Sequence, residues 1–382
     1  MNVINEVFDN LLGKIPCHNT ISNWVKKCGF DAYQKSGESL QGTDYATIID
    51  ESMMIGEEKL LLTIGVPAEH QGRPLECSDA NVLDVAVAKS WNGEKVKEQL
   101  KKAEEKVGHQ PHYVISDNAS ILKKGIREAH MNHHRDISHS LGMYLERTYK
   151  DEIDFKGYTK SMSDAKAKCS MTHEAYLLPP NQRTVARFIN LSSWVKWSEQ
   201  MLRIYHTLSD KEKSVFSFIP ANASLIFELY EVMECIQKIE YICKNEGLSQ
   251  SSVQECQNTT RTILFKGNMR MVKLGEYIKT FLEEEAELVG EKLIAHNNSS
   301  DIIESLFGKY KERKSPNKLY GVSPHVLFIP LYTRLINKEK AKCFNFKKSL
   351  EKIRIEHIQT WNEVNLSPNL VNLRTKYLKN AG

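Results

Sequence analysis

The sequence contains no long apolar run, no closely spaced cysteine pair and no low-complexity tract. No apolar stretch approaches 18 residues, so we expect no membrane-spanning helix and no membrane partner. The first residues contain no basic stretch followed by an apolar one, so we expect no secretory signal peptide. The eight cysteines form no C-x-x-C pair, so neither a disulfide framework nor a structural zinc site is indicated. These absences favour a protein of the reducing cytoplasm.

The composition is that of a globular protein with an uneven distribution of charge. The chain has 382 residues, of which 41% are hydrophobic and 26% charged, enough for two or three domains. Its net charge of +4 conceals a basic end: residues 305–382 contain 16 Lys and Arg against 5 Asp and Glu, which leaves the preceding residues at −7. A basic end on an acidic chain indicates a polyanionic partner, and a solvated helical face explains the same pattern.

The N-terminal segment has the pattern of two short helices around a tight break. Residues 2–12 have helical apolar spacing, and a second helix is expected over Ile21–Cys28, ended by Gly29. This pattern is typical of a helix-turn-helix DNA-binding unit, and a small helical hairpin is the alternative. The residues expected to face DNA are Ser22, Asn23, Lys26 and Lys27.

The next part of the chain alternates strands with helices. A hairpin is expected over Tyr45–Met54 and Lys59–Val66, followed by a third strand over Val82–Ala88. A helix over Trp91–Val107, a strand ending at Asp117, a helix over Ala119–Met131, a short strand over His134–His139 and a helix over Leu141–Tyr149 complete the series. This order predicts an α/β fold, with an antiparallel meander and then parallel strands joined by helices.

An all-α block follows, and then a helix with an acidic first turn. Helical periodicity is expected over Val185–Tyr205, Ser224–Glu246 and Leu274–Ile294. A later helix runs from Asp301 to about Lys311, and a basic amphipathic helix is expected over Lys338–Asn362.

Three carboxylates form a candidate metal site. Asp50 and Asp117 are each delivered by an apolar, β-branched run, and Glu304 is carried by the later helix. Hard oxygen ligands select Mg²⁺ or Mn²⁺, and two such ions hold the attacking and leaving oxygens of a phosphoryl transfer. A turn or helix cap explains Asp117-Asn118 equally well, but Asp is depleted inside strands, where Asp50 lies.

The glutamate has competitors. Asp301 lies one turn from Glu304 on nearly the same helical face, and Glu283–Glu285 is a separate acidic run. We favour Glu304 because Lys309 and Lys311 follow it, so one helix would ligate metal and contact the DNA backbone. The histidines at 130, 133 and 134 suggest a metal site by composition alone, and Trp194 and Trp197 have the spacing of core residues.

Taken in order, these motifs resemble a DDE transposase with an RNase H-like catalytic core. In that family the first aspartate lies on the first strand, the second just after the fourth strand and the glutamate on a later helix, and Asp50, Asp117 and Glu304 take those places. Transposases of the hAT and Mutator-like groups add a C/D-x-x-H motif, which Asp136-Ile-Ser-His139 matches. They also interrupt the core with an insertion, and 187 residues separate Asp117 from Glu304.

The resemblance implies an RNase H-like mixed sheet flanked by helices, interrupted by an all-α insertion and preceded by a helix-turn-helix. It divides the chain into residues 1–40 (helix-turn-helix), 41–154 (first part of the core), 155–297 (insertion), 298–330 (core helix with Glu304) and 331–382 (basic C-terminal segment). His139 either orients a phosphate or is a core histidine.

The implied function is that of an insertion-sequence transposase, found with the nucleoid of a prokaryote. Two Mg²⁺ or Mn²⁺ ions would be its cofactors, and its partners would be the terminal repeats of a mobile element, target DNA and further copies of the chain. The rivals are another RNase H-like nuclease or resolvase, which lacks strand joining, and a transposase-derived DNA-binding protein without catalysis.

Overall fold

The computed structural model describes residues 16–52, 54–181, 188, 191–290, 294–312, 321–336, 338–367 and 370–380. These residues divide into two compact units. The sheet unit comprises residues up to 68, residues 75–133 and residues from 300 on. The helical unit comprises residues 69–74 and 134–299. The helix expected over residues 2–12 lies outside the described residues.

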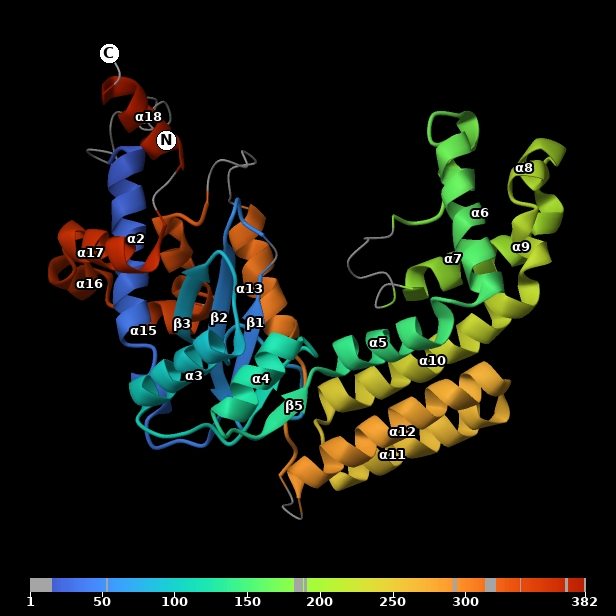
Figure 1. Cartoon of the computed structure of the whole chain (residues 1–382), viewed down its shortest axis with the longest axis horizontal. Helices are drawn as coiled ribbons and strands as arrows, with labels where there is room; N and C mark the ends of the chain where they lie inside the picture. The colour runs from blue at the N-terminus through green and yellow to red at the C-terminus, as the bar shows by residue number, and fades with distance from the viewer. Residues whose placement is uncertain are drawn as a thin grey trace. The chain divides into compact units, whose positions relative to one another are not determined.

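A five-stranded mixed sheet with the order β3-β2-β1-β4-β5 organises the sheet unit (Figure 1). The strands are β1 (Tyr45–Glu51), β2 (Lys59–Pro67), β3 (Asn81–Ala88), β4 (Val114–Ser116) and β5 (His133–Arg135). β1 and β3 each pair antiparallel with β2, and β1 pairs parallel with β4. The expected order of strands and helices, and with it the α/β class, is confirmed.

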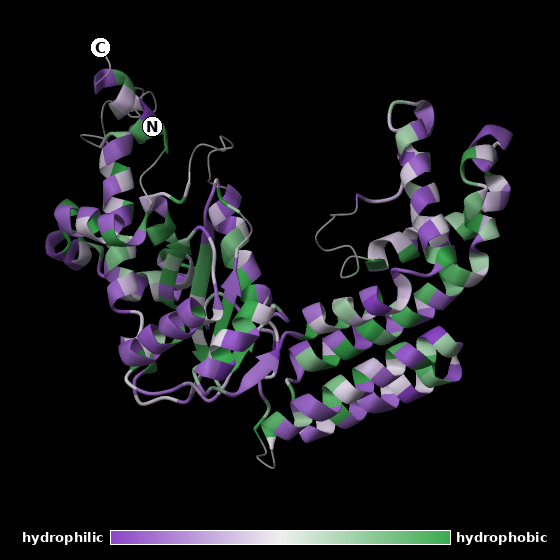
Figure 2. Ribbon diagram, in the orientation of Figure 1, coloured by the Kyte–Doolittle hydropathy of each residue, from purple (hydrophilic) through white to green (hydrophobic). Residues whose placement is uncertain are grey.

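Helices cover both faces of the sheet. Alternate residues of a strand point to opposite faces, so β1 contributes Ile49 to one apolar cluster and Ile48 to the other. The Ile49 face packs against α3 (Gly93–Val107) and α4 (Ser120–Glu128), and the Ile48 face packs against α13 (Asp301–Glu312). Figure 2 shows the corresponding apolar strands between amphipathic helices.

The helix α2 (His18–Gln34) packs in the sheet unit against C-terminal helices. The C-terminal elements are η5 (Pro324–Phe328), α14 (Ile329–Arg334), α15 (Lys338–Cys343), α16 (Phe346–Lys352), α17 (Ile355–Asn365) and α18 (Leu370–Asn380). Phe30 of α2 makes an edge contact with Trp361 of α17, with 6.5 Å between ring centroids. The expectation of a single helix over Lys338–Asn362 is wrong, because the chain turns between α15, α16 and α17, and α16 and α17 pack against α2.

The predicted end of α2 at Gly29 is also wrong, since the helix continues to Gln34. Gly29 is needed for close packing instead: a Cβ at this position would lie 1.9 Å from the carbonyl oxygen of Leu327 in η5. A glycine inside a helix lowers local helix propensity by only about 1 kcal/mol, which tertiary contacts outweigh.

The helical unit contains no strand apart from the end of β5 among the residues that the structure describes. Its elements are α5 (Ile137–Tyr149), α6 (Ile153–Cys169), η2 (His173–Leu177), α7 (Leu191–Ile204), η3 (Tyr205–Thr207), α8 (Asp210–Val215), α9 (Phe218–Ala221), α10 (Ala223–Asn245), α11 (Gln250–Ile263), η4 (Leu264–Lys266) and α12 (Met269–Val289). One apolar cluster joins them, and Trp194 is part of it, as expected. In the described part of the chain, no helix is both long and apolar enough to cross a bilayer.

The unit boundary falls at His134, so α5 belongs with the helical unit rather than with the sheet. The strand predicted over His134–His139 is wrong beyond Arg135. Asp136 is the N-cap of α5, and its Oδ1 accepts the backbone N–H of His139 at 2.7 Å. Capping by a buried carboxylate therefore starts the helix where continued strand was expected.

Candidate functional site

Asp50 and Asp117 lie at matching positions on two neighbouring strands. The parallel register pairs Thr47 with Val114 and Ile48 with Ile115, so continuing it by two residues pairs Asp50 with Asp117. Asp50 is near the end of β1, and Asp117 directly follows β4. Adjacent strands are about 4.8 Å apart, so the sheet brings two carboxylate-bearing positions 67 residues apart in sequence next to one another.

Asp50 belongs to the sheet face that α13 covers. Ile48 of β1 lies in the apolar cluster that includes Ile303 of α13. Because side chains alternate along a strand, Asp50, two residues further along β1, lies on the same face as Ile48. Asp117 directly follows β4, the strand next to β1.

Local hydrogen bonds orient both aspartates. Asp50 Oδ1 accepts the backbone N–H of Glu51 at 2.7 Å, and Asp117 Oδ1 accepts that of Ala119 at 2.8 Å. Both residues are half-buried. Carboxylates that sit at a sheet edge with part of their surface accessible have the donor chemistry of a magnesium or manganese ligand.

Glu304 lies in the first turn of α13, as predicted, and is exposed. Buried Ile303 and Phe307 hold this helix on the sheet, so Glu304 is at the flank of the apolar stripe. Helical geometry places Lys311 about 20° from Glu304 around the axis and Lys309 about 140° away. Lys309 Nζ instead lies 3.2 Å from Cys77 Sγ, so only Lys311 shares the side of the helix that Glu304 occupies.

The described residues contain no group of three or more His, Cys, Asp or Glu side chains arranged to hold a metal ion. Asp50, Asp117 and Glu304 therefore do not form such a group in this structure: the two aspartates lie on and just after neighbouring strands, and Glu304 lies on the covering helix. Asp301, the alternative third ligand, is also exposed at the start of α13. The competing run Glu283–Glu285 belongs to the helical unit, where Glu284 and Glu285 form ion pairs with Arg135.

The Asp136-x-x-His139 motif forms the N-terminal turn of α5. Asp136 is buried and His139 is half-buried, and the backbone N–H of His139 is the group that Asp136 caps. The motif thus has a structural role as a helix cap, which involves the backbone of His139 and not its ring.

The four residues expected to face DNA on α2 are all half-buried rather than exposed. Ser22 Oγ lies 3.3 Å from His325 Nε2, and Lys27 Nζ donates to the carbonyl oxygen of Leu350 at 3.5 Å. Burial also lowers the pKa of Lys26. Part of the surface assigned to DNA in the sequence therefore packs against the C-terminal elements, while Ile21 and Trp24 are exposed.

A buried polar network was not found by sequence reasoning. His134 Nδ1 lies 2.8 Å from Glu285 Oε2, and His134 Nε2 lies 2.9 Å from His296 Nδ1. Arg135 Nε donates to Glu285 Oε1 at 2.7 Å. Burial raises the pKa of the Glu285 carboxyl, but the hydrogen bonds and charges of His134 and Arg135 outweigh it and leave the pKa below its usual value. The sequence singled out His134 and Glu285 only in separate groups, the histidines at 130, 133 and 134 and the acidic run Glu283–Glu285, and gave no sign that the two residues meet.

Those neighbouring histidines point to different partners. His133 Nε2 lies 2.8 Å from Ser116 Oγ, whereas His134 joins the buried network.

Comparison with protein-family models and with curated proteins gave no match for this sequence. The function is therefore inferred from the residues of the candidate site, Asp50, Asp117 and Glu304, and from their placement on the sheet and on α13.

Proposed function

We propose that this chain is a metal-dependent DNA transposase with an RNase H-like core, in which Asp50, Asp117 and Glu304 form the active site. One observation supports the proposal: the parallel register of β1 and β4, continued by two residues, sets Asp50 level with Asp117, and α13 covers the face on which Asp50 lies. A mixed sheet, two aspartates at one edge and a glutamate on a helix that follows an all-α insertion are what the resemblance implies.

The proposed chemistry follows from the negative charge at the C-terminal ends of β1 and β4. Two carboxylates about 5 Å apart repel each other unless a cation lies between them. A pair of Mg²⁺ or Mn²⁺ ions would lower the pKa of a bound water or hydroxyl and would stabilise the negative charge on the leaving oxygen. Asp50 and Asp117 would hold and orient these ions, and Glu304 in the first turn of α13 would be the third ligand.

The biological reaction would be cleavage at the ends of a mobile element and joining of the freed 3′-hydroxyls to target DNA. Joining two ends at one target requires at least two copies of the chain, so we propose a homo-oligomer that works at the nucleoid. The basic C-terminal segment would supply phosphate contacts, which weaken as salt rises.

A strand-transfer assay tests this proposal. The substrates are duplexes from the DNA that flanks the reading frame, with a pre-cut 3′-hydroxyl, and a supercoiled plasmid serves as target. We expect joined product with Mg²⁺ or Mn²⁺, and none with Asp50→Asn or Asp117→Asn. The matched control is Asp44→Asn, which changes an exposed aspartate just before β1 that hydrogen-bonds His112.

Each rival predicts a different result. Hydrolysis without joining indicates an RNase H-like nuclease or resolvase. Duplex binding that is unaffected by Asp50→Asn, with neither cleavage nor joining by the wild type, indicates a DNA-binding protein without catalysis, and it would overturn the proposal.

A further inference from the structure

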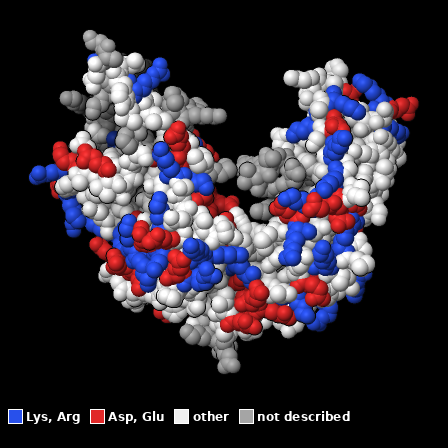
Figure 3. Space-filling view, in the orientation of Figure 1, with Lys and Arg blue, Asp and Glu red and all other residues white. Residues whose placement is uncertain are grey.

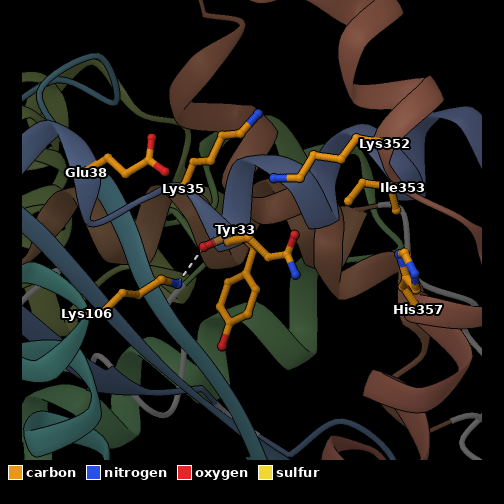
Figure 4. Close-up of a pocket in the computed structure, with 8 residues that line it drawn as sticks. Tyr33, Lys35, Glu38, Lys106, Lys352, Ile353 and His357 are labelled. Carbon is orange, nitrogen blue, oxygen red and sulfur yellow. Dashed lines mark hydrogen bonds between the residues drawn. The ribbon is translucent and has the colours of Figure 1, made fainter.

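A cavity of about 570 Å³ lies beside the C-terminal end of α2, and none of the three candidate carboxylates lines it. Its lining includes the basic residues Lys35, Lys106, Lys352 and His357, together with the acidic Glu38. These side chains come from α3, α16, α17 and the segment after α2 (Figure 4). We call it the basic cavity.

Lys106 is fixed in place at the wall of the basic cavity. Its Nζ donates to the carbonyl oxygens of Tyr33 and Leu83, the latter at 2.8 Å, and lies 3.8 Å from the centre of the Tyr33 ring. Burial lowers the pKa of Lys106 to about 8 despite the nearby charge of Asp84. In Figure 4 the side chains of Lys106 and Lys352 enter from opposite sides and point toward each other across Tyr33.

A second cavity of about 500 Å³ shares Lys35 and Glu38 with the first. Arg334, Lys348 and the buried Asp31 also line it. Burial lowers the pKa of the Arg334 guanidinium, which the charge of Glu38 only partly offsets. Two cations, Lys106 and Arg334, are thus desolvated in adjoining cavities, and burial outweighs the attraction of the nearby carboxylates for each of them. A bound anion would stabilise such an arrangement.

The charge of the two cavities is positive overall. Five cationic side chains (Lys35, Lys106, Arg334, Lys348, Lys352) face three carboxylates (Asp31, Glu38, Asp84), which gives +2 with His357 neutral. Among these, Lys35 pairs with Asp31 at 2.7 Å, and Asp84 accepts the hydroxyl of Tyr33 at 2.6 Å. Lys348 and Lys352 are exposed at the rim, so their charges are available to a ligand.

From this arrangement we infer that the basic cavity binds a phosphate group of the DNA backbone, an inference that rests on the proposed function. A phosphodiester carries one negative charge per nucleotide, so a backbone phosphate in the basic cavity and its neighbour at the adjoining cavity would balance the excess of +2. Lys352 of the basic cavity and Lys348 of the adjoining second cavity would contact phosphate oxygens, while the anchored Lys106 supplies a fixed positive potential. The DNA surface would then lie where α2 ends against α16, rather than on the half-buried face of α2.

Fluorescence anisotropy with a labelled 30-base-pair duplex tests this inference in the full chain. The variant is Lys348→Met with Lys352→Met, both exposed, and the matched control is Lys97→Met with Lys102→Met on α3. Figure 3 shows basic and acidic side chains interspersed over α3, as on an ordinary solvated helix. We expect about tenfold weaker binding for the first variant, with a slope of log K against log salt reduced by about 2, and no change for the control.

The outcomes separate this inference from the proposed function. Equal affinities and salt slopes for the two double variants would overturn the inference and leave the proposed function standing. A wild type that binds no duplex at any salt concentration would contradict both. Titration with inorganic pyrophosphate, followed by ³¹P NMR, tests whether the ligand is a free phosphate compound. If the Lys348→Met, Lys352→Met variant loses pyrophosphate binding but keeps its affinity for duplex DNA, the cavity binds a small anion and not DNA.

Discussion

His134 and Glu285, 151 residues apart in sequence, are hydrogen-bonded at 2.8 Å with both side chains fully buried. His134 is the residue at which the chain enters the helical unit, and Glu285 lies near the end of its last long helix. A buried carboxylate of this kind is tolerated only while its partners remain in place.

Glu285→Gln should destabilise the helical unit by about 3–5 kcal/mol, because it removes the charge that His134 and Arg135 surround. Urea unfolding followed by circular dichroism measures the change. The control is Glu283→Gln, an exposed neighbour 4.0 Å from Lys279, which should cost at most about 0.5 kcal/mol. Similar losses for the two variants would show that the buried network contributes nothing specific.

The same carboxyl predicts a pH dependence. The pKa of Glu285 is below its ordinary value of 4.5 in the folded chain, so the unfolded chain binds more protons in the acidic range. Its stabilising contribution is present above about pH 4.5 and is lost as the pH falls through the folded-state pKa. Thermal melts between pH 3 and pH 7 should show a shallower acid dependence for Glu285→Gln than for the wild type.

Asp50→Asn should stabilise the metal-free chain by about 1 kcal/mol, the order of the repulsion between two charges about 5 Å apart in water. That corresponds to a rise of about 2–4 °C in the melting temperature. Addition of Mg²⁺ should raise the melting temperature of the wild type but not of this variant. Asp44→Asn should respond to Mg²⁺ as the wild type does, and equal responses from all three proteins would argue against a metal at Asp50.

Gly29→Ala should destabilise the packing of α2 on η5 by about 1–3 kcal/mol, because the added Cβ would lie 1.9 Å from the carbonyl oxygen of Leu327. Gly308→Ala in α13 is the matched control, since a Cβ added there would meet none of the described atoms within 4 Å. At that position the change should stabilise the helix by about 0.5–1 kcal/mol. Opposite signs in denaturant unfolding are the expected result, and two losses of similar size would contradict it.

Lys106→Met should alter stability at alkaline pH. Burial lowers the pKa of Lys106 to about 8 from the ordinary 10.5, so between these values the unfolded chain binds more protons than the folded one. The wild type should therefore gain stability from this residue as the pH rises from about 8 to 10.5, and Lys106→Met should lack that gain. The control Lys102→Met, one helical turn earlier and exposed, should follow the wild type.

The sequence was a good guide wherever local pattern decides structure. The strand around Asp50, the strand before Asp117 and the helix that carries Glu304 were all predicted close to their observed bounds. β-Branched runs and helical apolar spacing are properties of neighbouring residues, so they can be read without knowledge of the fold. The same holds for the order of elements in the sheet unit.

Tertiary packing decided the rest. In the sequence Gly29 has the pattern of a helix terminator, but in the structure its lack of a side chain allows α2 to pack closely against Leu327. Asp136 looks like part of a strand, yet a capping hydrogen bond to His139 begins α5 there. Ser22 and Lys27 are half-buried, and their contacts are with His325 and Leu350, more than 300 residues further along the chain.

By itself, then, the sequence determined the α/β class, the positions of Asp50, Asp117 and Glu304 on their elements, and the excess of positive charge near the C-terminus. Only the tertiary structure decided that Asp50 and Asp117 match in register, that Lys309 turns away from Glu304, and that basic residues from α3, α16, α17 and the end of α2 line one cavity. The physical reason is that helix and strand periodicity act over a few residues, whereas register, burial and the summing of charge depend on contacts between segments far apart in the chain.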